Sequence, residues 1–164
     1  MSIMHKPAKI TDKSLSNAKD YMAHMAHIGD FDQECFIMVS MSPDRRIIGD
    51  HIIGLGGFHD SYADASVVFN RLISDKAYSF IIAHNHPNGV GIFSQGDVLM
   101  TIKLLLLSQL LGFTMLNHIL FPHKRLCVSM KTVYPKLWTK DYLNILHLAL
   151  EKHFPKKAIE KLLG

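Results

Sequence analysis

Runs of consecutive apolar residues, separated by amphipathic and turn-rich segments, constrain the fold of this chain more than any other feature. The run ECFIMVSM (34–41) is apolar on both faces apart from its first residue, which is typical of a strand in the middle of a sheet. YSFIIA (78–83) indicates a second buried strand. RRIIGDHIIGLG (45–56) predicts one or two strands of a hairpin, and FTMLNHILF (113–121) and RLCVSM (125–130) predict the last strands.

Helical segments alternate with these runs. YADASVVFNRLISDK (62–76) is amphipathic, and residues 95–111 form a largely apolar helix that ends at Gly112. The order of elements predicts an α/β fold in which helices flank one mixed central sheet, with an added C-terminal helix. The expected buried face of 62–76 is Ala65, Val68, Phe69, Leu72 and Ile73. The outer helices are expected at 13–29, capped by Ser14 or Ser16, and at 140–153, with Tyr142, Ile145, Leu146, Ala149 and Leu150 on one side, before a short helix or coil from Pro155.

Length and charge indicate how the chain is organised. The 164 residues suit a single domain, and an apolar content of 48% is enough for a sizeable core. We expect residues 1–130 to form the main domain and residues 131–164 a helical extension that packs on it or on a partner. Residues 124–164 carry nine Lys/Arg and only three Asp/Glu. This basic tail, with Trp138 and Tyr142 among its lysines, fits either a nucleic-acid partner or a solvated helix face, and a homo-oligomer is also compatible with it.

The N-terminal sequence and the cysteines bear on location. MSIMHKPAKITDK has no apolar core of a signal peptide, and Cys35 and Cys127 form no CxxC pair. The most apolar segment, VLMTIKLLLLSQLLGFTML, is interrupted by Lys103 and Gly112, so we expect a buried helix rather than a membrane span. A cytoplasmic protein with reduced, buried thiols is the resulting expectation.

A metal site is predicted where YSFIIA runs into HNHPNGVGIFSQGD (84–97). If the strand continues, His84 and His86 point to the same face, because side chains alternate along a strand. The Asn88-Gly89 turn lets the loop curl back, and a helix then begins with Asp97 in its first turn. Two imidazoles and one carboxylate suit zinc and leave a fourth position open, as in catalytic zinc sites that activate water.

Hydrolysis at such a site needs further groups. Glu34 opens a central strand and is the only glutamate before residue 151, so it is the candidate general base. Ser94 is placed to donate a hydrogen bond to an oxyanion. The competing interpretation is that Ser94 and Asp97 form only a helix capping box, a role that Asp97 could not easily combine with metal binding. His118 is either a partner of the site residues or a buried core histidine.

These residues together resemble a known motif. Glu34, then His84-x-His86-Pro87, then Ser94-x-x-Asp97 is similar to the JAMM (MPN+) metalloprotease motif, with matching spacing throughout. Within that superfamily, IIAHNHPNG and LGFTMLNHILF resemble the bacterial RadC-like JAB domain, over roughly residues 30–130. Asn117 departs from the aspartate common at its position, and these 164 residues contain no match to the helix-hairpin-helix region often found ahead of this domain.

The resemblance implies a JAB/MPN-like fold, a sandwich similar to cytidine deaminases. It implies zinc on His84, His86 and Asp97, Glu34 as general acid/base and Ser94 as the oxyanion group, acting in hydrolysis of peptide or isopeptide bonds. The alternative is a DNA-associated RadC-like protein of repair, recombination or a mobile element, including a metal-dependent nuclease. A zinc-binding module without turnover is a third reading. A contiguous HNH string does not match HNH nucleases, whose named residues are spread over a ββα unit.

Overall fold

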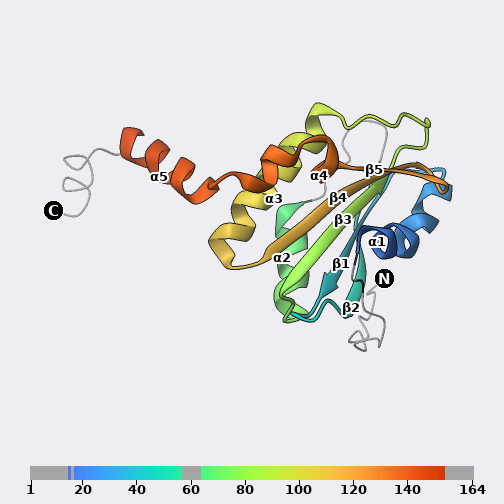
Figure 1. Cartoon of the computed structure of the whole chain (residues 1–164), viewed down its shortest axis with the longest axis horizontal. Helices are drawn as coiled ribbons and strands as arrows, with labels where there is room; N and C mark the ends of the chain where they lie inside the picture. The colour runs from blue at the N-terminus through green and yellow to red at the C-terminus, as the bar shows by residue number, and fades with distance from the viewer. Residues whose placement is uncertain (1–14, 16, 57–63, 154–164) are drawn as a thin grey trace.

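A single mixed sheet organises the molecule (Figure 1). The computed structural model describes residue 15 and residues 17–56 and 64–153. The elements in chain order are α1 (Ala18–Met25), the 3-10 helix η1 (Ala26–Asp30), β1 (Cys35–Met41), β2 (Ile47–Leu55), α2 (Ala65–Ser74), β3 (Ser79–Asn85), α3 (Gln95–Leu111), β4 (Thr114–His123), β5 (Leu126–Ser129), α4 (Met130–Val133), the 3-10 helix η2 (Pro135–Thr139) and α5 (Tyr142–His153).

Within the described residues, five strands lie in the order β2-β1-β3-β4-β5. Of these described strands, β3 and β4 pair in parallel, and the other neighbouring pairs are antiparallel. The prediction of a mixed sheet within an α/β fold is therefore confirmed. β1 and β3 are buried along their whole length, as their unbroken apolar runs predicted, and the segment 45–56 contributes one strand, β2, rather than two.

Helices cover both faces of the sheet, which explains why the central strands do not alternate in polarity. On one face, Met38, Phe80 and Ile82 pack against α2 and α3, for example at Leu72 and Leu104. On the other face, the intervening strand residues pack against α1 and η1; this second cluster includes Tyr21, Met25, Ile28, Ile37, Val39, Ile81, Ala83, Ile119 and Phe121.

Helix boundaries follow local capping chemistry. Asn17 caps α1 through a reciprocal capping box with Asp20, whereas the expected caps Ser14 and Ser16 lie outside the described residues. Asp64 caps α2, and α3 spans 95–111 as predicted, ending at Gly112 in the left-handed conformation (φ 78°). One predicted core residue is wrong: Ile73 is 61% exposed, whereas Leu72 before it is fully buried, because Ile73 lies at the edge of the apolar face that Ala65, Val68, Phe69 and Leu72 form.

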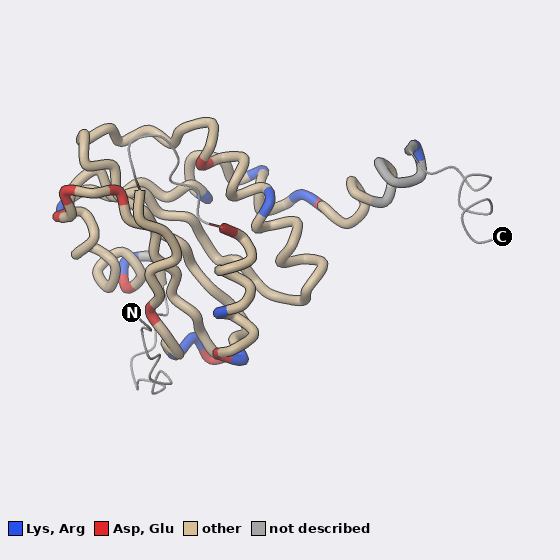
Figure 2. The backbone as a smooth tube through the Cα atoms, turned by 180° about the vertical axis from the view of Figure 1, so that it is seen from behind, with Lys and Arg blue, Asp and Glu red and all other residues tan. Residues whose placement is uncertain are grey.

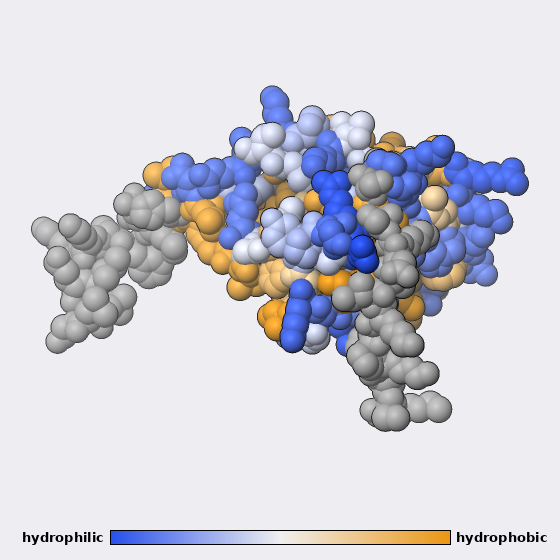
Figure 3. All heavy atoms as spheres, turned by 60° about the horizontal axis from the view of Figure 1, so that its bottom comes forward, coloured by the Kyte–Doolittle hydropathy of each residue, from blue (hydrophilic) through white to orange (hydrophobic). Residues whose placement is uncertain are grey.

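The C-terminal segment leaves the body of the molecule (Figure 1). Gln109 of α3 holds its start, since the amide donates to Lys140 O (3.0 Å) and accepts from Tyr142 N (2.8 Å). Tyr142 is buried, but Ile145, which was predicted on the same side, is 51% exposed. Leu143 and Leu148 are exposed as well. Apolar side chains are accordingly visible at the surface on the side that leads to α5 (Figure 3). Residues from Pro155 onward lie outside the described part of the chain.

No helix in the described part of the chain has the length and apolar character needed to cross a membrane.

Candidate metal centre

The two histidines of the HNHP segment lie where β3 ends and its loop begins. β3 runs to Asn85, and His86 N donates to Phe121 O of β4 (3.1 Å), which prolongs the sheet pairing by one residue. The His84 ring is fully buried and stacks on Phe36, with centroids 4.5 Å apart and planes 7° from parallel. His84 is therefore fixed by the core, whereas His86 faces the boundary between core and solvent.

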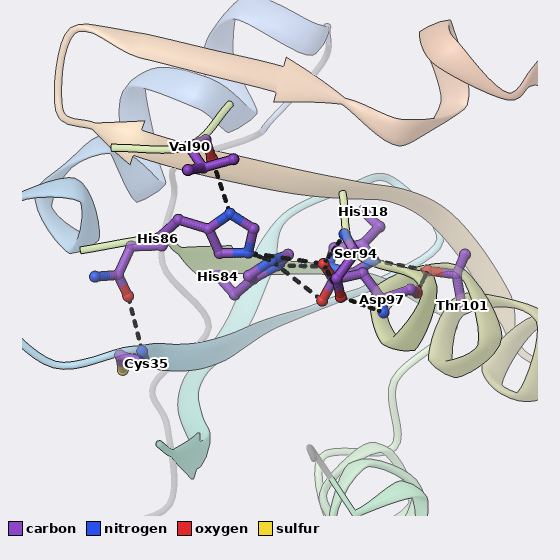
Figure 4. A network of polar contacts seen from close by, with 9 residues as sticks. Cys35, His84, His86, Val90, Ser94, Asp97, Thr101 and His118 are labelled. Atoms are coloured by element: carbon purple, nitrogen blue, oxygen red, sulfur yellow. Dashed lines mark hydrogen bonds and ion pairs between the residues drawn. The ribbon is translucent and has the colours of Figure 1, made fainter. Parts of the chain in front are cut away.

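The Nε2 atoms of the two imidazoles face each other at 3.1 Å (Figure 4). Nδ1 of His86 lies 2.8 Å from Val90 O. A carbonyl oxygen only accepts hydrogen bonds, so this Nδ1 carries a proton and a neutral His86 keeps an unshared electron pair on Nε2. The loop 87–91 thus directs the Nε2 electron pair of His86 toward His84.

Asp97 completes the cluster from the first turn of α3. Its Oδ1 lies 3.3 Å from His84 Nε2, and its Oδ2 lies 3.7 Å from His86 Nε2. Oδ2 also accepts from Ser94 N (2.7 Å) and Ser94 Oγ (2.8 Å), while Asp97 N donates to Ser94 Oγ (3.1 Å). Capping the helix and facing the imidazoles are therefore compatible, contrary to the expectation that Asp97 would do one or the other.

Charge at this cluster favours a cation between the three side chains. Burial raises the pKa of the Asp97 carboxyl, but contacts with His84, His86 and Ser94 outweigh it and hold that pKa well below its usual range. The Asp97 carboxylate in turn raises the pKa of His86, although burial opposes it. A negative group that stays ionised beside two ring nitrogens stabilises either a proton or a metal ion at this position.

Glu34 approaches the same nitrogens from the neighbouring strand. It directly precedes β1, and a carboxylate oxygen of Glu34 and one ring nitrogen each of His84 and His86 all lie within 4.8 Å of one another. The Glu34 side chain is partly exposed on a pocket of about 540 Å³, which residues 32–34, Gly56 and residues 86–88 line. The structure therefore brings the predicted base and the predicted ligands together at one pocket wall.

Asn85 positions Glu34, a role that the sequence analysis missed. Its side chain points to the other face of the sheet from the histidines, where Oδ1 accepts from Cys35 N (2.7 Å). Its Nδ2 donates to Phe31 O (3.0 Å) and Gln33 O (3.1 Å). Three hydrogen bonds from one buried amide thus fasten the segment that carries Glu34 to the strand that carries the histidines. The only sequence signal was a polar residue inside a buried strand, which must have partners.

His118 lies behind His84 on β4, as one of its two sequence interpretations predicted. It is fully buried, and its Nε2 lies 2.8 Å from His84 Nδ1. Its other nitrogen lies 2.7 Å from Thr101 Oγ1 on α3. Burial, reinforced by His84, holds the pKa of His118 well below its usual range, so the ring is neutral.

The spacing of these atoms fits a four-coordinate metal ion. Metal–nitrogen distances of 2.0–2.1 Å in tetrahedral zinc sites put neighbouring ligand atoms about 3.3 Å apart. The His84 Nε2–His86 Nε2 distance of 3.1 Å and the His84 Nε2–Asp97 Oδ1 distance of 3.3 Å match that separation. Without a proton or metal ion between them, the unshared electron pairs on His84 Nε2 and His86 Nε2 would face and repel each other. The residues present therefore fit a cation at this position.

Comparison with known proteins agrees with the sequence motif. The sequence profile of the RadC-like JAB domain matches residues 13–134. The chain belongs to the RadC-like JAB domain family. A UPF0758 protein of Carboxydothermus hydrogenoformans is 30% identical over 104 residues, which are 63% of this chain and 46% of the relative. A UPF0758 protein of Clostridium perfringens is 29% identical over 99 residues, 60% of this chain and 43% of the relative.

This RadC-like JAB domain spans about half the length of the curated relatives that it matches. A UPF0758 protein of Syntrophomonas wolfei, 26% identical over 125 residues, aligns with 76% of this chain but with 51% of its own length. The names of these relatives do not state an activity. The family is therefore established by sequence, whereas the reaction has to be argued from the site.

Proposed function

We propose that this RadC-like JAB domain is a zinc-dependent hydrolase of amide bonds, a metallopeptidase or isopeptidase. The observation that carries the proposal is the convergence of His84, His86 and Asp97, with Glu34 beside them on a pocket wall. Two imidazole nitrogens and a carboxylate oxygen favour zinc among common metals. When bound, zinc would polarise the scissile carbonyl and make water a stronger nucleophile at neutral pH.

Asp97 is assigned as the third ligand and Glu34 as the general base. Asp97 is buried and held in place by Ser94, as a ligand needs to be. Glu34 is partly exposed on the pocket, so its carboxylate has access both to water and to substrate. In the proposed reaction, Glu34 takes a proton from the attacking water and delivers it to the leaving amine nitrogen as the amide bond breaks.

Ser94 supports the reaction first by orienting Asp97. Its hydroxyl donates to Asp97 Oδ2, so the single hydroxyl proton is engaged with the carboxylate. Donation to the oxyanion of a substrate, the role expected from the sequence, requires that this proton turn toward the pocket. That role stays a prediction.

The charge of the pocket favours a peptide over a nucleic acid. Asp32 and Glu34 lie among the described residues that line it, and none of these residues is Lys or Arg. Phosphodiesters are repelled by such a surface, whereas a peptide backbone is uncharged. A protein or peptide substrate is therefore the proposed class.

One observation supports the alternative that the protein is associated with DNA. Lys131, Lys136, Lys140 and Lys152 are exposed along the C-terminal elements (Figure 2). The aromatic residues give that alternative less support, because Tyr142 is buried and Trp138 is half-buried, with its Nε1 donating to Met115 O (3.0 Å). Their rings are packed against the core rather than available for stacking on bases.

The experiment compares zinc-loaded wild-type protein with Glu34→Gln at equal zinc content. Both are incubated with a peptide library, with isopeptide-linked lysine conjugates and with single- and double-stranded DNA; cleavage is read by mass spectrometry and gels. We expect new peptide or isopeptide ends with the wild type only. Cleavage of DNA without cleavage of any amide would replace the proposal by the nuclease alternative. Equal amide cleavage by both proteins would refute the role of Glu34.

A further inference from the structure

Behind the candidate metal centre, a chain of buried hydrogen bonds runs from His84 through His118 to Thr101 and back to the backbone of Asp97. The links are His84 Nδ1–His118 Nε2 (2.8 Å), His118 Nδ1–Thr101 Oγ1 (2.7 Å) and Thr101 Oγ1–Asp97 O (2.7 Å). His118 and Thr101 are both fully buried. Figure 4 shows this chain lying on the α3 side of His84.

The directions of these hydrogen bonds follow from one acceptor. Asp97 O is a carbonyl oxygen, so the single hydroxyl proton of Thr101 is donated to it. Thr101 Oγ1 must then accept from His118 Nδ1–H. With its proton on Nδ1, neutral His118 presents an electron pair on Nε2, which accepts from Nδ1–H of His84. The proton of His84 therefore lies on Nδ1, and its Nε2 electron pair faces His86 and Asp97.

We infer that His118 and Thr101 are positioning residues that hold His84 in the tautomer able to bind the metal through Nε2. The inference rests on the proposed metal site and deepens it. His84 is fully buried and has no backbone carbonyl at its Nδ1 of the kind that Val90 supplies to His86. The chain of hydrogen bonds from His84 through His118 and Thr101 to Asp97 O, here called the relay, supplies that acceptor instead: His118 Nε2 accepts from His84 Nδ1–H. Because the relay returns to the backbone of Asp97, α3 orients one metal ligand directly and a second through His118.

The test uses matched variants at both relay positions. Thr101→Val is close in shape to threonine but cannot accept from His118, whereas Thr101→Ser keeps the hydroxyl. His118→Phe removes the relay, whereas the amide oxygen of His118→Gln can accept from His84 Nδ1–H. Imidazole tautomers are read by nitrogen NMR on the metal-free proteins, and zinc affinity is measured by competition with a chelator. Neither measurement depends on hydrolysis.

In the wild type we expect His84 and His118 both to carry the proton on Nδ1. Thr101→Val and His118→Phe should lose zinc affinity by about tenfold to a hundredfold, the usual effect of removing such a partner. Thr101→Ser and His118→Gln should stay closer to wild type. In Thr101→Val the His84 proton should move to Nε2.

Two results would overturn the inference. One is a wild-type spectrum with the His84 proton on Nε2. The other is zinc affinity in folded Thr101→Val within twofold of that in Thr101→Ser. Because the tautomers are measured without metal, an inactive protein with the expected tautomers would contradict the proposed function while leaving the relay intact.

Discussion

Two buried histidine–aspartate groups occupy different parts of this sheet, and they differ in what their polar atoms do. At the candidate metal centre, His84, His86 and Asp97 gather where β3 ends. Near the opposite end of the neighbouring strands, His51 of β2 pairs with Asp75, the C-terminal cap of α2, with an Nε2–Oδ2 distance of 2.6 Å. Ser40 of β1 donates to the same Asp75 oxygen.

In the second group, the described contacts join the side chains directly to one another. Asp75 Oδ2 accepts from both His51 and Ser40, and the His51 and Asp75 side chains are 3% and 9% exposed. At the metal centre the separations between facing atoms are longer, 3.1 to 3.7 Å, and a pocket adjoins them. A buried histidine–carboxylate pair is thus not in itself a metal site. Two ring nitrogens directed at one point by their own Nδ1 contacts make the difference.

The sharpest test of this comparison removes one histidine from each group. His84→Ala or His86→Ala should reduce bound zinc from about one per chain to near zero, because a single histidine and a carboxylate bind zinc weakly. His51→Ala should keep zinc at the wild-type level but lower the free energy of unfolding by about 3–5 kcal/mol, because it breaks a buried pair. Elemental analysis and denaturant unfolding measure the two effects. Loss of zinc from folded His51→Ala would contradict the proposed difference between the two groups.

The next largest effect concerns the base beside the metal centre. Glu34→Gln should slow amide hydrolysis by about 10²–10⁴-fold, since glutamine cannot accept a proton, while the bound zinc is unchanged. Asp75→Asn, in the group of His51, should leave the rate constant of the folded protein unchanged. Steady-state kinetics at equal zinc content compare the two. A Glu34→Gln enzyme within threefold of wild type would contradict the assignment.

A smaller effect is expected on the opposite face of β3. Asn85→Ala removes the hydrogen bonds that fasten residues 31–35, so the base moves relative to the histidines. Hydrolysis should fall by about 100-fold, as expected for a displacement of about 1 Å, with zinc content retained. Asn70→Ala, at an exposed position of α2, is the control and should match wild type. Unaltered kinetics in Asn85→Ala would show that Glu34 needs no such support.

The smallest effect is stabilisation by the metal itself. At free zinc ten times the Kd, the free energy of unfolding should rise by about 1.4 kcal/mol, because zinc binds the folded chain. Thermal unfolding of wild type and of His51→Ala should shift upward alike, and His84→Ala should not shift. An equal zinc-dependent shift in His84→Ala would place the ion elsewhere on the molecule.

The sequence predicted the sheet, and it singled out side chains that the fold brings together, because both depend on local patterns. Unbroken apolar runs identify β1 and β3, and the spacing from His84 to Asp97 fixes a strand, a turn and a helix start. Contacts between distant segments were not predictable in this way. The His51–Asp75 pair joins residues 24 positions apart, and Asn85 reaches back 50 positions to Cys35.

Exposure at the ends of elements was equally hard to predict. Helical periodicity placed Ile73 in the core, but this residue lies at the edge of the buried face of α2 and is exposed, whereas Leu72 beside it is buried. Likewise, aromatic residues among lysines gave no indication that the Trp138 indole would hydrogen-bond to Met115 O of β4. A pattern reports which face a residue occupies, but not how far the neighbouring layer extends.

The central claim is that His84, His86 and Asp97 bind one zinc ion, and anomalous diffraction from zinc-loaded crystals tests it most directly. We predict a single strong anomalous peak at about 2.0–2.2 Å from His84 Nε2, His86 Nε2 and an Asp97 oxygen, with Glu34 beside it but not bound to it. No peak there in zinc-loaded crystals, or a peak only at another histidine such as His24 or His51, would contradict the account.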